Sequence, residues 1–257
     1  MPERIISNRV ENQYRYHIYA SINGVKGLPG KDKTEALVKA KISEEAFAVE
    51  RVYFVKTDRL HNPRKVNPFK YFPGTLPVLV SAPHSVRHMR QKKIKPSDEF
   101  TGSIACLLNT LTGCHSLTAA KLYGGDPNFD DKCIYKDTLY NLAREHRFCL
   151  VIDIHGASRQ HGFDIDIGTI KGRSLLGRAK YPELLKKYLS QYEITAISEN
   201  HFTVSGQNTV TNYVSGVLGI PAIQLEINKQ FRAPHQNARN YCRMVGALAD
   251  FIRSVVK

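Results

Sequence analysis

From residue 77 onward the chain alternates short apolar runs with amphipathic segments, and this alternation constrains the fold more than any other feature of the sequence. Short apolar runs predict buried strands, and the amphipathic segments between them predict helices packed on a sheet. The predicted strands are PVLVSA (77–82), FCLVIDI (148–154), FDIDIG (163–168), EITAIS (193–198) and PAIQLEI (221–227). The predicted helices cover 99–111, 135–146, 181–191, 208–218 and 235–255. The pattern indicates an α/β domain with a mixed, largely parallel sheet flanked by helices.

Residues 1–75 do not show this alternation. They contain two strand-like patches, YRYHIYASI (14–22) and ERVYFVKT (50–57), with a helix-like stretch, KTEALVKAKISEEAF, between them. Proline and glycine then accumulate between residues 63 and 77, which is typical of a boundary. We expect a β-rich N-terminal extension over 1–75 that packs on a main α/β domain over 76–257, a length sufficient for a full hydrophobic core.

The chain carries a net charge of +14 at pH 7, and its densest basic run is RHMRQKKIK (87–95). Such a charge attracts polyanions, so nucleic acid, an anionic membrane surface and a small acidic substrate are all partners to consider. The basic residues are dispersed, tryptophan is absent, and no Arg/Gly-aromatic RNA-binding signature occurs, which disfavours nucleic acid. The basic run is equally consistent with a solvated loop and with a binding patch.

Membrane and disulfide chemistry are also disfavoured. No run approaches the roughly 20 apolar residues that span a bilayer, and the first residues, MPERIISNRVENQYRYH, lack the apolar core of a signal peptide. We therefore expect a cytoplasmic protein without a membrane partner. Five cysteines with no CxxC pair fit reduced structural thiols: Cys106, Cys114, Cys133, Cys149 and Cys242.

Polar residues stand at the ends of three of the apolar runs. VLVSAPHS contains His84, LVIDIHG contains His155, and AIQLEIN carries Glu226. Ligands of open α/β sheets bind just outside the carboxyl ends of the strands, so these side chains can converge on one crevice although they are far apart in sequence. We expect that crevice to be the functional site.

A catalytic zinc ion takes three protein ligands and leaves one position for water. His84 and His155 are candidates for two ligands, and the acidic pair Asp98 and Glu99 is the nearest candidate in sequence for the third. Asp153, two residues before His155 on the same strand face, is better placed to orient a histidine than to bind the metal.

Each of these residues also has a structural interpretation. A histidine after a strand is often a hydrogen-bonded loop residue, and Asp98 suits the cap of the helix that follows it. Glu226 is different because Leu225 and Ile227 place its carboxylate inside an apolar run, where burial is costly unless the group is paired or used.

Five short motifs carry a resemblance to a known family. They are SAPHS (81–85), SDEFTGSIA (97–105), DPNFDD (126–131), VIDIHGAS (151–158) and QLEINKQFR (224–232). Their order and spacing over residues 77–255 resemble the N-formylglutamate amidohydrolase family, which is similar to zinc carboxypeptidases and aspartoacylase-like deacylases. The resemblance implies a zinc-carboxypeptidase-like (phosphorylase/hydrolase-like) fold and a metal-dependent amidohydrolase.

For individual residues, the resemblance implies one zinc ion per chain bound by His84, His155 and an acidic residue of the 98–99 pair, with Asp98 favoured over Glu99. It also implies Glu226 as the general base and acid. Two departures concern the substrate. The family's PHSG or PHGG continues here as PHSVRH, and of its typical Asn-Arg pair only Asn128 is present.

An acylated amino acid carries a free carboxylate, which a guanidinium holds better than an ammonium does. Arg90 and Arg159 are the arginines we favour for this role, and Asn200 and His201 are weaker candidates for the same site, since a turn or cap suits them better. We therefore expect hydrolysis of a small acidic N-acyl amino acid such as N-formylglutamate, or of a γ-glutamyl or peptide amide. The alternatives are a carboxypeptidase-like peptidase and a basic binding protein without activity on the same fold.

Overall fold

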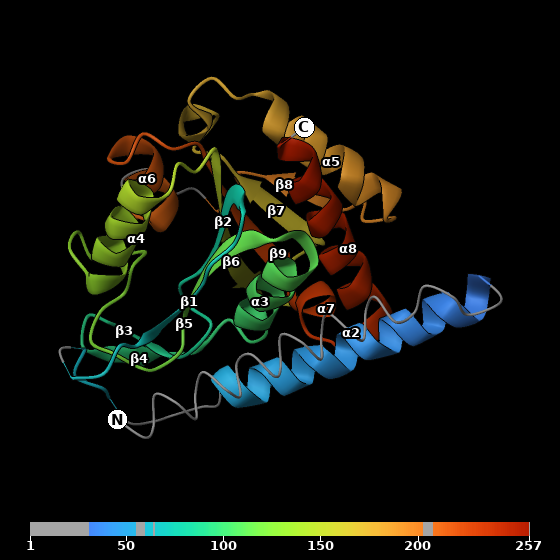
Figure 1. The fold of residues 1–257 in the computed structure, drawn as a ribbon, viewed down its shortest axis with the longest axis horizontal. Helices are drawn as coiled ribbons and strands as arrows, with labels where there is room; N and C mark the ends of the chain where they lie inside the picture. The colour runs from blue at the N-terminus through green and yellow to red at the C-terminus, as the bar shows by residue number, and fades with distance from the viewer. Residues whose placement is uncertain (1–30, 55–59, 64, 203–207, 257) are drawn as a thin grey trace.

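The computed structural model describes residues 31–54, 60–63, 65–202 and 208–256, with side chains from residue 41 onward (Figure 1). Its centre is a seven-stranded sheet in the order β1-β5-β2-β6-β9-β7-β8. The strands are β1 (Phe69–Phe72), β5 (Cys114–Ala119), β2 (Leu76–Ala82), β6 (Leu150–Ala157), β9 (Ala222–Asn228), β7 (Ile165–Gly168) and β8 (Ile197–Glu199). The four strands β5, β2, β6 and β9 run parallel, whereas β1 pairs antiparallel with β5 and β7 pairs antiparallel with β9. The predicted fold class, a mixed and largely parallel sheet flanked by helices, is confirmed.

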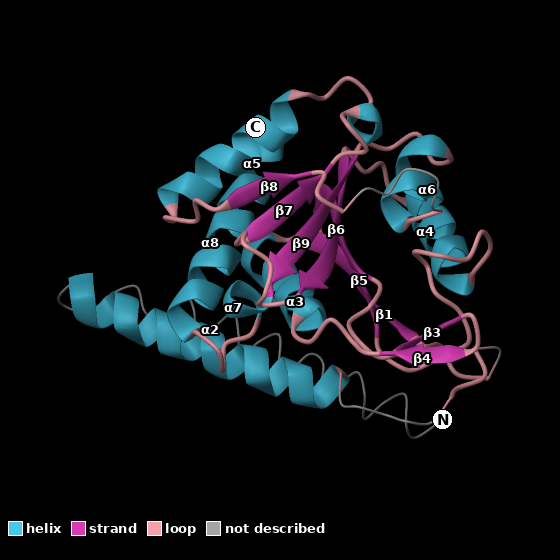
Figure 2. Cartoon of the chain, turned by 180° about the vertical axis from the view of Figure 1, so that it is seen from behind, coloured by secondary structure: helices cyan, strands magenta, loops and turns pink. Residues whose placement is uncertain are grey.

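Helices cover both faces of this sheet (Figure 2). One face packs against α3 (Thr101–Thr112), α5 (Lys180–Gln191) and α8 (Ala238–Val255), and the other lies towards α4 (Ile134–Glu145) and α6 (Val210–Gly216). Two short helical turns, η1 (Arg173–Leu175) and α7 (Lys229–Arg232), connect these elements. Among the described residues, no helix is long and apolar enough to cross a membrane.

The two sheet faces differ in chemistry because strand residues alternate between them. Ile152 and Ile154 of β6 point into the large apolar core beneath α3 and α8. Asp153 and His155, the residues between and after them, are buried on the opposite face. A row of polar side chains therefore lies on the α4 and α6 side of the sheet, and the site is built there.

A separate two-stranded hairpin follows β2. It consists of β3 (His88–Arg90) and β4 (Lys93–Lys95), so the basic run of the sequence is a hairpin. Its two turn residues, Gln91 and Lys92, have φ values of 50° and 62°. Positive φ at both positions is what a tight two-residue hairpin turn requires.

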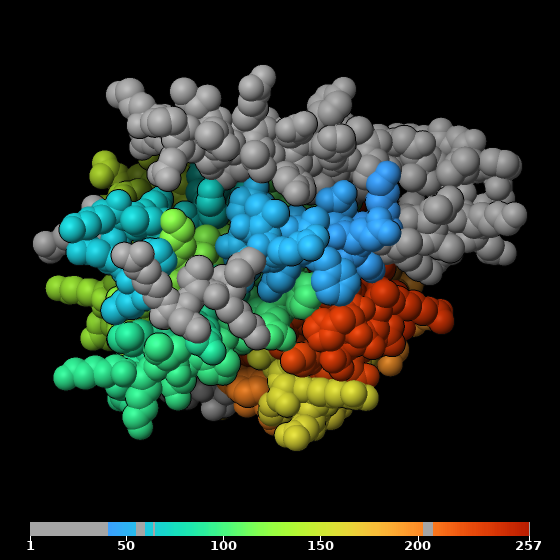
Figure 3. Space-filling model, turned by 90° about the horizontal axis from the view of Figure 1, so that it is seen from below, coloured from blue at the N-terminus to red at the C-terminus, as the bar shows by residue number. Residues whose placement is uncertain are grey.

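An additional helix, α2 (Lys31–Tyr53), lies outside the layer formed by α3 and α8 (Figure 1). Figure 3 shows its blue side chains against the red C-terminal segment. Ala46 and Val49 of this helix are buried. Helix α2 therefore packs on the α3 and α8 side of the main domain.

The N-terminal region is where the predicted elements fail. The strand predicted at 50–57 is wrong where it is described, because residues 50–53 form the last turn of α2. Tyr53 and Phe54, which made this stretch resemble a strand, instead join Val49 in an apolar cluster at helical spacing. The helix-like stretch 33–47 is confirmed within α2, and the strand predicted at 14–22 lies outside the described residues.

The five helices and five strands predicted beyond residue 76 are present with shifted ends. The largest shift is at 193–198, where β8 begins only at Ile197. Strand β5 was not predicted because His115, Ser116 and Thr118 interrupt its apolar pattern, although all three are buried. The division of the chain at residue 75 stays a prediction.

Candidate metal centre

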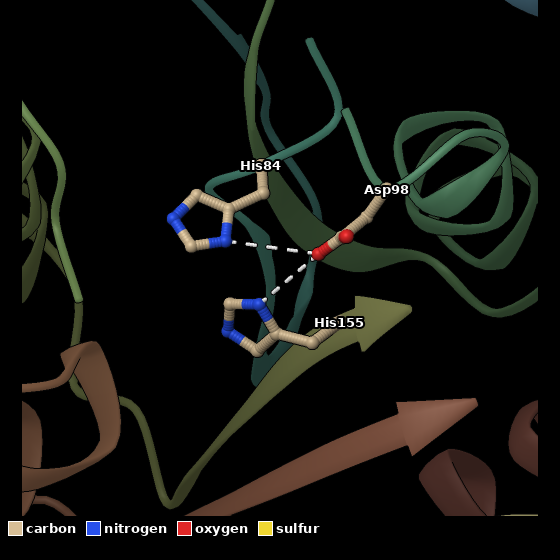
Figure 4. A group of neighbouring side chains, drawn as sticks. All are labelled: His84, Asp98 and His155. Carbon is tan, nitrogen blue, oxygen red and sulfur yellow. Dashed lines mark ion pairs between the residues drawn. The ribbon is translucent and has the colours of Figure 1, made fainter. Parts of the chain in front are cut away.

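Three side chains from separate elements converge at one end of the polar sheet face (Figure 4). His84 lies in the turn after β2, Asp98 precedes α3, and His155 is on β6. The Oδ2 atom of Asp98 is 3.7 Å from Nδ1 of His84 and 3.4 Å from Nδ1 of His155. The three potential ligand atoms all lie within 4.8 Å of one another, so one ion can reach all of them.

The local backbone explains how residues so far apart meet. β2 and β6 are parallel neighbours, and Ser81 pairs with Asp153, so the chain after β2 emerges beside the end of β6. The amide of Asp98 donates a hydrogen bond to the carbonyl of His84 at 2.8 Å. The segment before α3 is thereby tied directly to one of the histidines.

Each histidine is oriented by a buried carboxylate on its other ring nitrogen. Nε2 of His84 lies 2.9 Å from Oδ1 of Asp126, and Nε2 of His155 lies 3.0 Å from Oδ2 of Asp153. Both carboxylates are fully buried. A carboxylate that accepts a hydrogen bond from the Nε2–H group fixes the tautomer whose Nδ1 lone pair is free for a metal. Two imidazole nitrogens and one carboxylate oxygen, oriented in this way, fit a zinc ion.

The electrostatics of the three residues favour a cation between them. Burial alone would raise the pKa of Asp98, but hydrogen bonds with His155 and His84 hold it well below its ordinary value. Burial alone would lower the pKa of His84, and hydrogen bonds with Asp126 and Asp98 raise it instead. The pKa of His155 is raised well above its ordinary value against the effect of burial, chiefly by Asp153. The carboxylates therefore make this a negative site that stabilises positive charge at the imidazoles.

Glu226 lies directly beside the three converging side chains. It is opposite His155 in the parallel pairing of β6 with β9, so both side chains project from the same face. Burial raises the pKa of Glu226, while the nearby His155 lowers it. Its Oε1 accepts a hydrogen bond from Nε2 of Gln224 at 3.0 Å. A carboxylate with a raised pKa next to a metal site is suited to accepting and returning a proton.

These residues share one cavity of about 540 Å³. It is lined by His84, His88, Arg90, Lys95, Pro96, Asp98, Asn128, His155, Gly156, His201, Phe202, Thr209, Gln224 and Glu226. The volume is within the range of about 300–1,000 Å³ that is usual for small-molecule sites. The three strand-end residues singled out from the sequence thus line the same space.

The acidic pair is separated by the structure. Asp98 faces the histidines, whereas the carboxylate of Glu99 lies 3.2 Å from Nζ of Lys229 and lines a different pocket. The carbonyl of Glu99 accepts a hydrogen bond from the buried Arg232. The geometry therefore brings Asp98 to the histidines and leaves Glu99 facing away from them.

Two of the candidate substrate-binding residues, Arg90 and Asn128, line the cavity. Nε of Arg90 lies 2.5 Å from Oδ2 of Asp126, its guanidinium sits over the ring of Phe129, and it lines the cavity. Asn128 lines the cavity with Nδ2 3.0 Å from Nε2 of His155, and its Oδ1 accepts the amide of Val210.

Of the other three candidates, Arg159, Asn200 and His201, only His201 lines the cavity. Arg159 is exposed and does not line the cavity. Asn200 has the turn role, because its Oδ1 accepts the amide of Thr169 at 2.9 Å. His201, the residue after it, does line the cavity.

Asp126 is the residue that reasoning from the sequence missed. Its buried carboxylate pairs with His84, Arg90 and His88, the last through Nε2 of His88 at 3.3 Å. Burial alone would raise the pKa of Asp126, but the two histidines hold it well below its ordinary value. His84, His88 and Asp126 are also close enough to hold an ion, but the adjacent guanidinium of Arg90 opposes a second cation there. The sequence signal for this residue was the DPN triplet at 126–128, but the sequence did not indicate which side chain its aspartate contacts.

No family model and no curated protein matches this chain. Several solved structures do. A gene product of Agrobacterium tumefaciens is 12% identical over 80% of this chain and 97% of its own, with a TM-score of 0.50. A bacteriophage poly-γ-glutamate hydrolase is 15% identical over 74% and 88%, with a TM-score of 0.42, and the succinylglutamate desuccinylase of Chromobacterium violaceum is 17% identical over 70% and 64%, with a TM-score of 0.45. At these identities the likeness to the Agrobacterium protein concerns the fold alone.

Proposed function

We propose that the protein is a zinc-dependent amidohydrolase that cleaves the C–N bond of an N-acyl amino acid, such as N-formylglutamate, or of a related γ-glutamyl or peptide amide. One observation carries the proposal. The Nδ1 atoms of His84 and His155 meet the carboxylate of Asp98 while each Nε2 is held by its own buried carboxylate, and Glu226 lines the same cavity.

His84, Asp98 and His155 would hold the zinc ion, which would supply Lewis acidity toward the scissile carbonyl and the attacking water. Glu226 is placed to take a proton from the attacking water. The same carboxyl group then delivers the proton to the amide nitrogen as the C–N bond breaks. The products are a carboxylic acid and a free amine, so the reaction consumes one water and needs no other reactant.

Arg90 is the residue best placed for the substrate's free carboxylate. Its Nε is occupied by Asp126 and its face by Phe129, so the side chain is held in one orientation at the cavity wall. A guanidinium fixed at Nε still offers its two terminal nitrogens to a carboxylate. Asn128, fixed by Val210, contributes an amide beside His155. The proposed partner is therefore a small acidic substrate.

The test combines metal analysis with kinetics. We expect about one zinc per chain by elemental analysis, lost in His84→Ala and kept in the exposed control His235→Ala. Glu226→Gln should keep its zinc and lose about 10²–10⁴ in rate toward N-formyl, N-acetyl or γ-glutamyl amino acids, because general acid–base help is of that size. The exposed control Glu44→Gln should keep full activity.

A fully active Glu226→Gln protein would rule out the role given to that carboxylate. Purified protein that binds no zinc and instead binds nucleic acid in a salt-sensitive manner would support the basic binding protein. Release of C-terminal residues from peptides in preference to cleavage of acyl amino acids would support the peptidase.

A further inference from the structure

The cavity has an aromatic wall that the proposed reaction does not explain. His201 and Phe202, which follow β8, both line the cavity. Their rings belong to a cluster with His161 and Phe163, in which the ring centroids of His161 and Phe202 are 5.1 Å apart and those of His201 and Phe202 are 5.2 Å apart. The rings meet edge to face, at interplanar angles of 72° and 80°. Such packing holds ring faces in fixed directions.

The backbone beneath this wall is anchored by one buried carboxylate. Asp166 is 1% exposed, and it accepts hydrogen bonds from the amides of His201 at 3.0 Å and Phe202 at 3.3 Å. Asp166 also lies opposite Glu226 in the antiparallel pairing of β7 with β9. Directly opposed residues share a sheet face with Cβ atoms about 5 Å apart. The aromatic wall is therefore fixed immediately beside the proposed catalytic carboxylate.

The opposite wall of the cavity is basic. Of the described residues that line it, the arginine and the lysine are Arg90 and Lys95, and both come from the hairpin that follows β2. In the sheet, β6 and β9 lie between β2 on one side and β7 and β8 on the other. Those two middle strands carry His155 and Glu226. The reacting groups thus lie between a cationic wall and an aromatic wall.

The two walls give the substrate a direction. In an N-acyl amino acid the free carboxylate belongs to the amine half, on one side of the scissile bond, and the acyl group lies on the other side. A carboxylate held by Arg90 therefore directs the acyl group towards Phe202. A formyl group has no apolar surface to bury there, whereas a benzoyl-type group offers a ring face and edge to the cluster.

We propose that the substrates are N-acyl amino acids whose acyl group is aromatic, with the amino-acid carboxylate at Arg90 and the aromatic ring against Phe202. This inference rests on the proposed function and narrows its substrate class from N-acyl amino acids in general, N-formylglutamate included, to those with an aromatic acyl group. Hydrolysis adds water across the amide, giving an aromatic carboxylic acid and the free amino acid.

The test compares N-benzoylglutamate with N-acetylglutamate and N-formylglutamate on the zinc-loaded protein. We expect kcat/KM to be at least tenfold higher for the benzoyl compound. Phe202→Ala should lower that value about tenfold or more and leave the acetyl compound nearly unchanged, with Phe202→Leu between the two. Phe47→Ala, at an exposed phenylalanine outside this cavity, should change neither.

Binding provides a second readout that does not depend on turnover. Calorimetric titration of the Glu226→Gln protein should give a lower Kd for N-benzoylglutamate than for N-acetylglutamate, and Phe202→Ala should remove that difference. Hydrolysis of acetyl or formyl compounds with equal or higher kcat/KM, and an equal effect of Phe202→Ala on all three, would overturn the aromatic preference while leaving the amidohydrolase intact. Failure to hydrolyse any acyl amino acid would overturn both proposals.

Discussion

Helix α2 is linked to the candidate metal centre through one partly buried carboxyl group, that of Glu50. The first residue before α3, Phe100, has a left-handed φ of 66° and no side-chain cap from its own segment. Glu50 supplies that cap from α2, accepting the amide of Phe100 at 3.0 Å and the hydroxyl of Ser103 at 2.8 Å. Phe100 is two residues after Asp98, so this carboxylate stabilises the segment that carries the proposed metal ligand.

Replacing Glu50 by glutamine tests this arrangement through the pH dependence of stability. Burial is the main cause that raises the pKa of Glu50 from 4.5 to about 7, while Phe100 and Ser103 lower it. Between these two pH values the folded protein keeps a proton that the unfolded chain releases, so folding free energy is lost as pH rises through this window. At about 1.4 kcal/mol per pH unit, the loss amounts to about 3 kcal/mol.

Glu50→Gln removes this ionisation while its amide can still accept from Phe100 and donate to Ser103. We expect the free energy of unfolding of the variant, relative to the wild type, to rise by about 3 kcal/mol between pH 4.5 and pH 8. Urea unfolding of both proteins in the presence of a chelator measures this difference, in which other titrating groups cancel. The exposed Glu44→Gln on the same helix should give a flat difference. A flat or falling difference for Glu50→Gln would refute the raised pKa of Glu50.

Two further substitutions probe the surroundings of the metal centre. Asp126→Asn should weaken zinc binding about 10- to 100-fold, because His84 loses the carboxylate that orients it. Competition with a chromogenic chelator measures the zinc affinity, and the exposed Asp137→Asn is the control. Unchanged affinity would show that His84 needs no such partner. Gly156→Ala should lower stability by about 1–3 kcal/mol in thermal unfolding, because its Cβ would stand 2.5 Å from the buried guanidinium of Arg232. Gly162→Ala, with no atom within 4 Å, is the matched control, and equal melting temperatures for the two variants would contradict the clash.

Much of the fold beyond residue 76 could be predicted because the apolar pattern there follows the periods of strands and helices. Predictions from this pattern were wrong or missing where contacts with distant parts of the chain determine the local structure. In strand β5 the buried His115 forms a hydrogen bond with the hydroxyl of Tyr71 at 2.6 Å, so this polar residue is satisfied by a partner that is distant along the chain. Residues 50–53 have strand-like composition, but packing on α3 and α8 keeps them in a helix.

The sequence by itself determined which kinds of side chain stand at the strand ends, and so pointed to His84, His155 and Glu226. It could not decide between Asp98 and Glu99, because adjacent residues at the start of a helix point in different directions that only the packed backbone specifies. It also did not indicate that Asp126 contacts His84 or that Phe202 lines the cavity. Those assignments depend on the order of strands in the sheet, which brings loops after β2 and β8 to opposite sides of the same carboxylate. Contacts between segments this far apart are set by the packing of whole layers, and a local pattern of residues contains no record of them.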